Sequence, residues 1–393
     1  MNAHQARTAI GSLRNGIPPR GCVRAFTVGR AEDVGQLGTM LADGGSAALL
    51  LKADYGSGKS HLLSYIREQA LSQNYAVSQF ECDANTGVRF NRMDQIFGAV
   101  VRNLCVPGFE ESGPTAFFDR VVGPWVNGTD TTEHNEMLKV RRSEALKVAL
   151  RAWRVSAEHA DDYPTLRDEI AAWLSAPWDY RDRRKWLYEH LVEQLPPKRR
   201  DKRSIGEFCY LGVFEFSRHD HSQAWEALSD LDLLAQVAGL RGLVLLVDEF
   251  EDVLQSLQNI KLQRKAFDNL FRLFGGGFPG LSFYAVTPGF VSKCKGLLMN
   301  KVGWHCDYSK FDELRTFEIS PLGADELTNL AVRIMNAHGI AYGWEPDLEM
   351  KQSQLSGIVQ TAAEVEVPGR ARHTITSVVA ELDRLYQGAD GHR

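Results

Sequence analysis

Short, continuous apolar runs alternate with helix-like segments in two stretches of the chain. Strands buried on both faces of a parallel sheet have this composition, because helices cover both faces. The pattern predicts strands at residues 46–52, 75–83, 242–248, 281–286 and 316–319. It predicts intervening helices at 32–41, 60–72, 91–104, 223–239 and 259–274. Strands that alternate with helices indicate parallel pairing through right-handed crossovers, and therefore an α/β fold with a parallel-sheet core.

The alternation stops between residues 107 and 222. Only helical segments follow there, at 133–160, 165–174 and 181–195. We interpret this region as a helical insertion between two strands of the sheet. The last part of the chain has the pattern of three more helices, which would form a small bundle. They are predicted at 324–338, 348–363 and 371–386.

These elements divide the chain into five predicted segments. At 393 residues and 44% hydrophobic composition, the chain has enough apolar material for one large core and a smaller one. The segments are an N-terminal helix and connector (1–22), the first part of the α/β core (23–106), the helical insertion (107–222), the second part of the core (223–320) and the small helical domain (321–393).

The segment Ala-Asp-Tyr-Gly-Ser-Gly-Lys-Ser, residues 53–60, lies between a predicted strand and a predicted helix. Gly56 and Gly58 let the backbone curl so that successive N–H groups point at phosphate oxygens, next to the positive end of the helix. Lys59 would reach the β- and γ-phosphates, and the Ser60 hydroxyl would ligate Mg²⁺. The strict pattern has glycine where this chain has Ala53. The alternative is a glycine-rich turn without chemistry.

Three neighbours belong to the same predicted nucleotide-binding segment. Tyr55 and Ser57 lie within the loop, and His61 follows it. We expect His61 to be a neighbour of the nucleotide and not a metal ligand, because the chain has no metal-binding histidine spacing such as H-E-x-x-H.

A second acidic motif lies far downstream. The apolar run 242–247 ends in Asp248 and Glu249, as a Walker B strand does. Asp248 would hold Mg²⁺ through water, and Glu249 would orient and deprotonate the water that attacks the γ-phosphate. Any buried strand can end in an acidic residue. The pattern therefore indicates a catalytic role only because the chain also has a P-loop. We interpret Glu251 as a first-turn acid of the next helix.

Three further residues are candidate catalytic groups. Thr287 follows the predicted strand 281–286 and could sense the γ-phosphate; a capping or turn threonine is the alternative. Arg372 lies at a helix start, where a cation is disfavoured unless an anion is near; a solvated surface arginine is the alternative. Arg315 is a candidate arginine supplied to a neighbouring subunit, although no motif fixes it.

Composition limits the partners. The net charge of -5 argues against a surface uniformly adapted to nucleic acid, so any DNA contact would need a local patch. The basic stretch from Lys198 to Arg203 is one candidate, and a solvated loop is the alternative. Six scattered cysteines indicate reduced thiols. No apolar signal core and no long apolar run are present, so we expect a cytoplasmic protein without membrane contact.

The motifs in this order resemble an AAA+ ATPase of the origin-recognition branch. The closest likeness is to the P-loop ATP-binding proteins of bacterial BREX phage-defence loci, of the BrxD type. It rests on the P-loop, on Asp248 and Glu249, on Thr287 with Pro288, on Arg372, and on Val28, Gly29 and Arg30. The predicted elements include no carboxy-terminal winged helix, which departs from the origin-recognition pattern, so DNA binding by that route is not expected.

The resemblance implies ATP binding and hydrolysis and a helical lid over the nucleotide. It implies that Val28, Gly29 and Arg30 lie against the adenine and ribose, that Thr287 is sensor 1 and that Arg372 is sensor 2. It also implies work as a homo- or hetero-oligomer with other defence proteins, such as a helicase or methyltransferase.

Two functional classes stay open on the sequence. The first is an ATPase that remodels or assembles a defence complex acting on DNA. The second is a structural switch or scaffold that binds ATP with little or no hydrolysis. A small-molecule kinase is a third option, which the lid-like tail and the helical insertion argue against.

Overall fold

The computed structural model describes residues 1–82, 87–109, 111–158, 160–161, 164–178, 216, 221–251, 259–299, 307–345, 348–364 and 369–390. Within them lies a six-stranded sheet in the order β3-β2-β4-β5-β1-β6. All neighbouring strands are parallel except β3, which is antiparallel to β2. The predicted α/β fold with a mainly parallel sheet is therefore confirmed. The strands are β1 (Ala47–Lys52), β2 (Ala76–Glu81), β3 (Leu104–Cys105), β4 (Leu243–Asp248), β5 (Leu281–Val286) and β6 (Thr316–Glu318).

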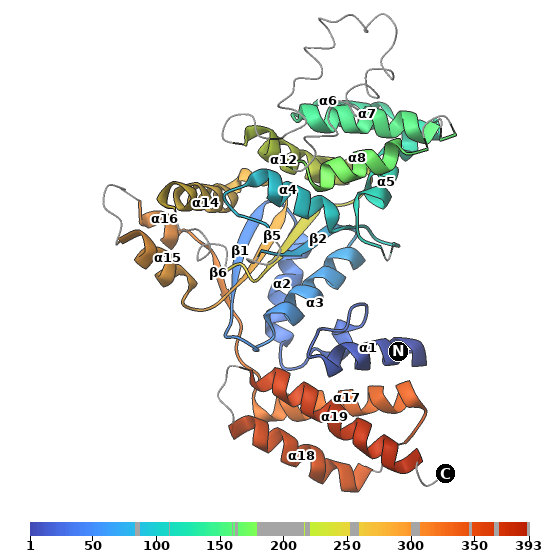
Figure 1. Ribbon diagram of the computed structural model, residues 1–393, viewed down its shortest axis with the longest axis vertical. Helices are drawn as coiled ribbons and strands as arrows, with labels where there is room; N and C mark the ends of the chain where they lie inside the picture. The colour runs from blue at the N-terminus through green and yellow to red at the C-terminus, as the bar shows by residue number, and fades with distance from the viewer. Residues whose placement is uncertain are drawn as a thin grey trace, which may run out of the picture.

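Helices cover both faces of the sheet (Figure 1). On one face α2 and α3 pack on alternate strand residues, such as Val244 and Leu246 of β4. On the other face α4, α12 and α14 pack on the residues between them, such as Leu245 and Val247. Each central strand is thus buried on both sides, which explains its continuous apolar sequence. The covering helices are α2 (Ala31–Asp43), α3 (Lys59–Ser72), α4 (Met93–Arg102), α12 (Ser222–Val237) and α14 (Ile260–Arg272).

Further helices stack on α4 and α12, away from the sheet (Figure 1). They include one difference from the sequence pattern: residues 133–160 form two helices, not one. Ser143 begins the second helix, because its Oγ accepts a hydrogen bond from the Leu146 N–H, and the carboxylate of Asp230 accepts from the N–H groups of Arg142 and Ser143. These helices are α5 (Pro114–Val126), α6 (Thr132–Lys139), α7 (Glu144–Glu158) and α8 (Leu166–Ser175).

Several short elements were not predicted. They are the 3₁₀ turn Val23–Phe26, the π-helical turn Leu273–Gly277, α15 (Phe290–Met299) and α16 (Ser309–Asp312). The predicted helix at 181–195 and the basic stretch from Lys198 to Arg203 lie outside the described residues. Among the described helices, none is both long and apolar enough to cross a membrane.

A second hydrophobic core joins the two ends of the chain. The N-terminal helix α1 (Ala3–Arg14) packs on α17 (Ala324–Tyr342) and α19 (Arg370–Asp390), and α18 (Leu348–Glu364) completes the bundle. Figure 1 shows these helices gathered on the α2–α3 side of the sheet. We call α17, α18 and α19 the C-terminal bundle. The apolar face of α1 has helical spacing and consists of Ala6, Ala9, Ile10 and Leu13.

Substitution of Asp230 tests the hydrogen bonds that join α12 to the start of α7. We expect Asp230→Ala to lower the free energy of unfolding by about 1–3 kcal/mol, because it leaves the buried Ser143 N–H and the part-buried Arg142 N–H without their acceptor. Urea unfolding measures the change. The exposed Asp161→Ala is the control and should change stability by less than about 0.5 kcal/mol. Equal effects of the two variants would contradict the capping role.

Candidate nucleotide-binding site

The P-loop (residues 53–60) connects β1 to α3, in the strand–loop–helix order that the sequence predicts. Gly56 and Gly58 have φ values of 74° and 95°, which residues with side chains rarely adopt. α3 begins at Lys59, and its N-cap Gly58 makes no side-chain cap. The first-turn N–H groups of α3 therefore face the cavity at its N-terminus, an arrangement suited to an anion.

Lys59 is buried to 7% exposure at the start of α3. Its Nζ donates a hydrogen bond to the Ala53 carbonyl at 3.2 Å and lies 3.5 Å from the Glu251 carboxylate. The Glu251 side chain is only 12% exposed. The sequence does not predict this contact, because an acidic residue shortly after a strand has the pattern of a first-turn acid of the next helix. The signal was an acidic residue just beyond the strand that ends in Asp248.

Asp248 ends β4 and Glu249 directly follows it; β5 lies between β4 and the P-loop strand β1. Glu249 lines the same cavity as Lys59, and its φ of 50° is in the left-handed region. This conformation costs a residue with a side chain about 1–2 kcal/mol. Asp248 accepts a hydrogen bond from the Glu249 N–H at 3.0 Å. Asp248 itself lines a different hollow, opposite Glu81 of β2.

Thr287 directly follows β5, between the P-loop and Glu249. Within the described part of the chain, its buried Oγ1 has no hydrogen-bond partner, and the same holds for Ser57 Oγ and Glu251 Oε2. Buried polar atoms are rarely left without a partner, and a bound ligand, ion or water is one explanation of the exceptions. These atoms come from the P-loop, the end of β5 and the segment after β4, so a polar ligand fits among these elements.

The opposite wall of the cavity comes from the second core. Gly16, Ile17 and Pro18, which follow α1, line it together with Arg372 of α19. Arg372 NH1 donates a hydrogen bond to the Tyr55 hydroxyl at 3.1 Å. The sequence therefore predicted Arg372 and Tyr55 as site residues, and both lie at this cavity. It did not predict the residues after α1, because nothing in their local pattern points to a ligand.

The start of α19 touches the P-loop backbone. The Gly369 N–H donates to the Tyr55 carbonyl at 2.9 Å. A Cβ built on Gly56 would lie only 2.5 Å from the Gly369 Cα. The positive φ and this close approach both require glycine at position 56.

A second, mainly apolar cavity adjoins the first. The two share Leu13, Gly58, His61, Ala371 and Ile375. Val28 and Arg30 line the apolar cavity, together with Phe26, Thr27, Leu322 and Leu330, whereas Gly29 lies outside its lining. The Glu326 side chain packs against Gly29, where a Cβ would lie 2.3 Å from the Glu326 Cγ.

Arg30 holds the P-loop backbone through hydrogen bonds of its guanidinium group. Its NH2 group donates to the Ser57 carbonyl at 2.7 Å, and NH1 donates to the Ser320 carbonyl and to the Asp33 carboxylate. Burial lowers the pKa of Arg30, which stays charged because an arginine titrates far above neutral pH. The arginine thus connects the P-loop to α2 and to the segment after β6.

His61 lies where the two cavities meet. Its Nε2 is 2.9 Å from Thr27 Oγ1, and the protein encloses the ring apart from the cavities that it lines. Burial, together with the charge of Arg30, lowers the pKa of His61 to about 4. A neutral imidazole therefore faces the cavities at neutral pH. Among the described residues, no cluster of three or more histidine, cysteine or acidic side chains could hold a metal ion alone.

Arg315 is exposed, just before the edge strand β6. Its carbonyl accepts a hydrogen bond from the Leu50 N–H, and its side chain does not line the cavities of its own chain. The structure thus brings eleven of the predicted site residues to the two cavities, and these do not include Arg315. The eleven are Val28, Arg30, Tyr55, Gly56, Ser57, Gly58, Lys59, Ser60, His61, Glu249 and Arg372.

The parallel sheet, the glycine loop and the lysine at a helix start define an α/β protein with a P-loop-type fold. Residues 1–173 match the model of the family described as "BREX system ATP-binding protein BrxC/D". This match confirms the resemblance to BREX ATP-binding proteins and supports ATP binding and a place in a BREX phage-defence system. It includes the P-loop and ends before β4. No curated protein and no solved structure matches the chain.

We expect the His61 imidazole to titrate near pH 4, against 6.5 for an ordinary histidine. NMR titration of the His61 ring signals measures this pKa, and a His61→Gln variant assigns the signals. The urea-unfolded chain is the control. Because the folded pKa is below the unfolded one, the unfolded chain binds this proton more readily. His61 therefore contributes stability that is full above about pH 6.5 and is lost as the pH falls toward about 4. A folded pKa near 6.5 would contradict the enclosed position.

Proposed function

We propose that the chain binds ATP across the two cavities and hydrolyses it. The triphosphate would lie on the P-loop at Lys59, and the adenine in the apolar cavity lined by Val28. The observation that carries the proposal is that Lys59, Glu249 and Arg372, from three distant parts of the sequence, line one cavity. Two cations near one carboxylate fit a phosphate transfer site, where catalysis needs charge stabilisation and a positioned water.

The residues present fit a magnesium nucleotide. The buried hydroxyls Ser57 Oγ and Thr287 Oγ1 lack partners among the described residues and could bond phosphate or water. Mg²⁺ would be held by the Ser60 hydroxyl and, through water, by Asp248, and it would neutralise phosphate charge. Glu249 would orient the attacking water and take its proton. Thr287 would act as sensor 1 and Arg372 as sensor 2, each touching the terminal phosphate, with Gly29 and Arg30 close to the base and ribose.

The family supports a wider role in BREX defence. We propose that ATP turnover by this AAA+ type of protein remodels or assembles a defence complex that acts on DNA in the cytoplasm. Partners would be other defence proteins, such as a helicase or methyltransferase. In a homo- or hetero-oligomer, Arg315 would reach the site of a neighbouring subunit; its exposure is compatible with that role. DNA would bind through the stretch from Lys198 to Arg203.

A second candidate is an ATP-dependent switch or scaffold with little turnover. It is favoured by two protein contacts at the site, that of Lys59 with Glu251 and that of Arg372 with the Tyr55 hydroxyl. ATP would exchange these protein contacts for phosphate contacts. Such an exchange would change the contact between the C-terminal bundle and the P-loop whether or not hydrolysis follows.

Two substitutions separate the candidates. Lys59→Ala should raise the Kd for ATP at least about tenfold, because it removes the cation on the phosphates. Glu249→Gln should keep the Kd within about threefold but lower kcat at least about a hundredfold, since it removes the general base. Calorimetry measures binding, and phosphate release measures turnover. Lys139→Ala and Glu136→Gln, an exposed pair on α6, are the controls.

The results decide between the two functions. Turnover in the wild type that Glu249→Gln abolishes supports hydrolysis. Binding that depends on Lys59 without turnover, in the presence of DNA and partner proteins, supports the switch. Absence of ATP binding by the wild type contradicts both.

Glu251 should oppose nucleotide binding. We expect Glu251→Gln to lower the Kd for ATP about threefold to tenfold, because the carboxylate pairs with Lys59 and would repel the phosphates. Calorimetry of the two proteins side by side measures it. Glu318→Gln is the matched control, since Glu318 pairs with Lys52 at 3.8 Å on the neighbouring strand. A higher Kd for Glu251→Gln would instead place Glu251 among the groups that hold the nucleotide.

A further inference from the structure

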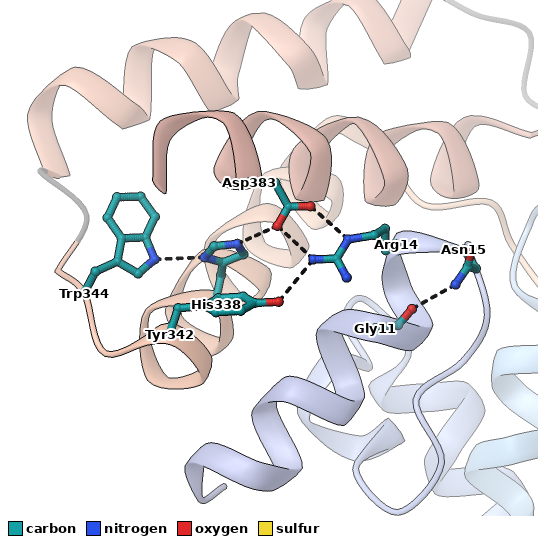
Figure 2. A network of polar contacts seen from close by, with 7 residues as sticks. All are labelled: Gly11, Arg14, Asn15, His338, Tyr342, Trp344 and Asp383. Atoms are coloured by element: carbon teal, nitrogen blue, oxygen red, sulfur yellow. Dashed lines mark hydrogen bonds and ion pairs between the residues drawn. The ribbon is translucent and has the colours of Figure 1, made fainter. Parts of the chain in front are cut away.

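A network of polar side chains fastens α1 to the C-terminal bundle (Figure 2). The Arg14 guanidinium donates to both oxygens of the Asp383 carboxylate, at 2.8 and 2.9 Å, and to the Tyr342 hydroxyl at 3.1 Å. His338 Nε2 lies 3.1 Å from the same carboxylate. The indole N–H of Trp344 donates to His338 Nδ1 at 2.9 Å. These residues come from α1, α17, α19 and the turn after α17.

The network permits one arrangement of donors and acceptors. An indole N–H can only donate, so His338 Nδ1 must accept, and its Nε2–H donates to Asp383. His338 is fully buried, and burial lowers its pKa, in agreement with a neutral ring. Burial would raise the pKa of Asp383, but the hydrogen bonds from Arg14 and His338 hold it below its usual value. A charged carboxylate thus receives donors from both sides, which fixes its orientation.

The apolar contacts of α1 do not fix the helix in the same way. Ala6, Ala9, Ile10 and Leu13 hold α1 on the bundle, but hydrophobic contact has no preferred direction. A two-pronged arginine–carboxylate pair does fix direction. In the first half of α1, Arg7 donates a single hydrogen bond to the Ala341 carbonyl at 2.7 Å. The bidentate anchor is therefore at the end of α1 that leads into the nucleotide cavity.

Arg14 lies two residues before Gly16, which touches Arg372. The chain turns tightly here, because the Gly16 N–H donates to the Leu13 carbonyl at 2.9 Å and Asn15 Nδ2 donates to the Gly11 carbonyl at 3.1 Å. Gly16 has a φ of 65°, and a Cβ at this position would be 2.7 Å from Arg372 Nε. The backbone of the connector thus limits where the Arg372 side chain can go.

We propose that Arg14 is a positioning residue of the nucleotide site. By anchoring the end of α1 to Asp383, it sets the Gly16 backbone against Arg372 and so aims that guanidinium at the P-loop. It follows that α1 travels with the C-terminal bundle as one body, and that the cavity wall at Gly16 moves with it. This inference rests on the proposed binding of ATP, and it assigns no chemistry to Arg14 itself.

The test compares two arginines of one helix. We expect Arg14→Met to raise the Kd for ATP about tenfold, the effect of losing one charge-assisted hydrogen bond. Arg7→Met, which also removes a bond between α1 and α17, should change it less than about twofold. Asp383→Asn is nearly isosteric but removes the charge that Arg14 binds. It should therefore raise the Kd for ATP about as much as Arg14→Met does. Calorimetry measures the Kd, and thermal unfolding confirms that each variant is folded.

A double-mutant cycle separates positioning from general stability. If Arg14 acts through Arg372, then Arg14→Met should have almost no further effect on the Kd in an Arg372→Met background. Effects of Arg14→Met and Arg372→Met that add fully would overturn the proposal. So would equal Kd values for Arg14→Met and Arg7→Met.

Hydrogen exchange gives a readout without nucleotide. The Gly369 N–H, bonded to the Tyr55 carbonyl, should exchange at least about fivefold faster in Arg14→Met than in Arg7→Met, because the start of α19 is then held less firmly on the P-loop. Unchanged exchange would overturn the proposal even if the wild type bound ATP. Absence of ATP binding by the wild type contradicts the proposed function, while the exchange result still decides whether Arg14 orders this contact.

Discussion

A buried ammonium group at Lys59 is the constraint on which the site depends. A lysine taken out of water must find oxygen atoms or negative charge, or its charged form becomes costly. Here the Ala53 carbonyl and the Glu251 carboxylate supply them. The loop must therefore curl back on itself, which Gly56 and Gly58 permit, and the chain after β4 must lie close to the loop. The same ammonium can exchange these oxygens for those of a phosphate.

A second constraint is that the cavities lie between two hydrophobic cores. The P-loop belongs to the core of the sheet, whereas Leu13, Ala371 and Ile375 belong to the core that α1 forms with the C-terminal bundle. The contact of Gly56 with Gly369 joins the cores through backbone atoms. A shift of one core against the other therefore changes the cavity before it disturbs either core. Such a junction suits a ligand whose binding must be converted into movement.

The sequence predicted those parts of the fold that have local signals. The strands β1, β4 and β5 carry continuous apolar runs, and the P-loop carries its glycines and lysine, so each was found within one residue of its observed start. The break between α6 and α7 was missed because its cause, Asp230, is far away in the sequence. The two-residue strand β3 is too short to show a period. In these cases tertiary contacts decide the local structure, and a single sequence does not display them.

The site shows the same division between local and long-range information. Lys59, Glu249 and Arg372 were predicted as motifs, and all line one cavity. Leu13, Gly16 and Ile375 were not predicted, because apolar residues and glycines at a cavity look like any others. Glu251 was predicted only as a first-turn acid of the next helix, and residues 252–258, which would test this, lie outside the described residues. Only the folded chain places its carboxylate at the Lys59 ammonium.

The family match includes only some of the residues that line the site, and this matters for the evidence on hydrolysis. It covers the P-loop and the helix α1 that supplies one wall, and it ends before Asp248, Glu249, Thr287 and Arg372. ATP binding is therefore supported by the family and by the geometry together, whereas turnover is supported only by this chain's own residues.

Among these residues, Glu249 is the most informative about turnover. A left-handed backbone in a residue with a side chain is unfavourable, and such strain persists where surrounding contacts impose it, often at functional sites. The hydrogen bond from its N–H to Asp248 and the bond from the Phe250 N–H to the Ala285 carbonyl impose it here, and they turn the Glu249 side chain toward the cavity of Lys59.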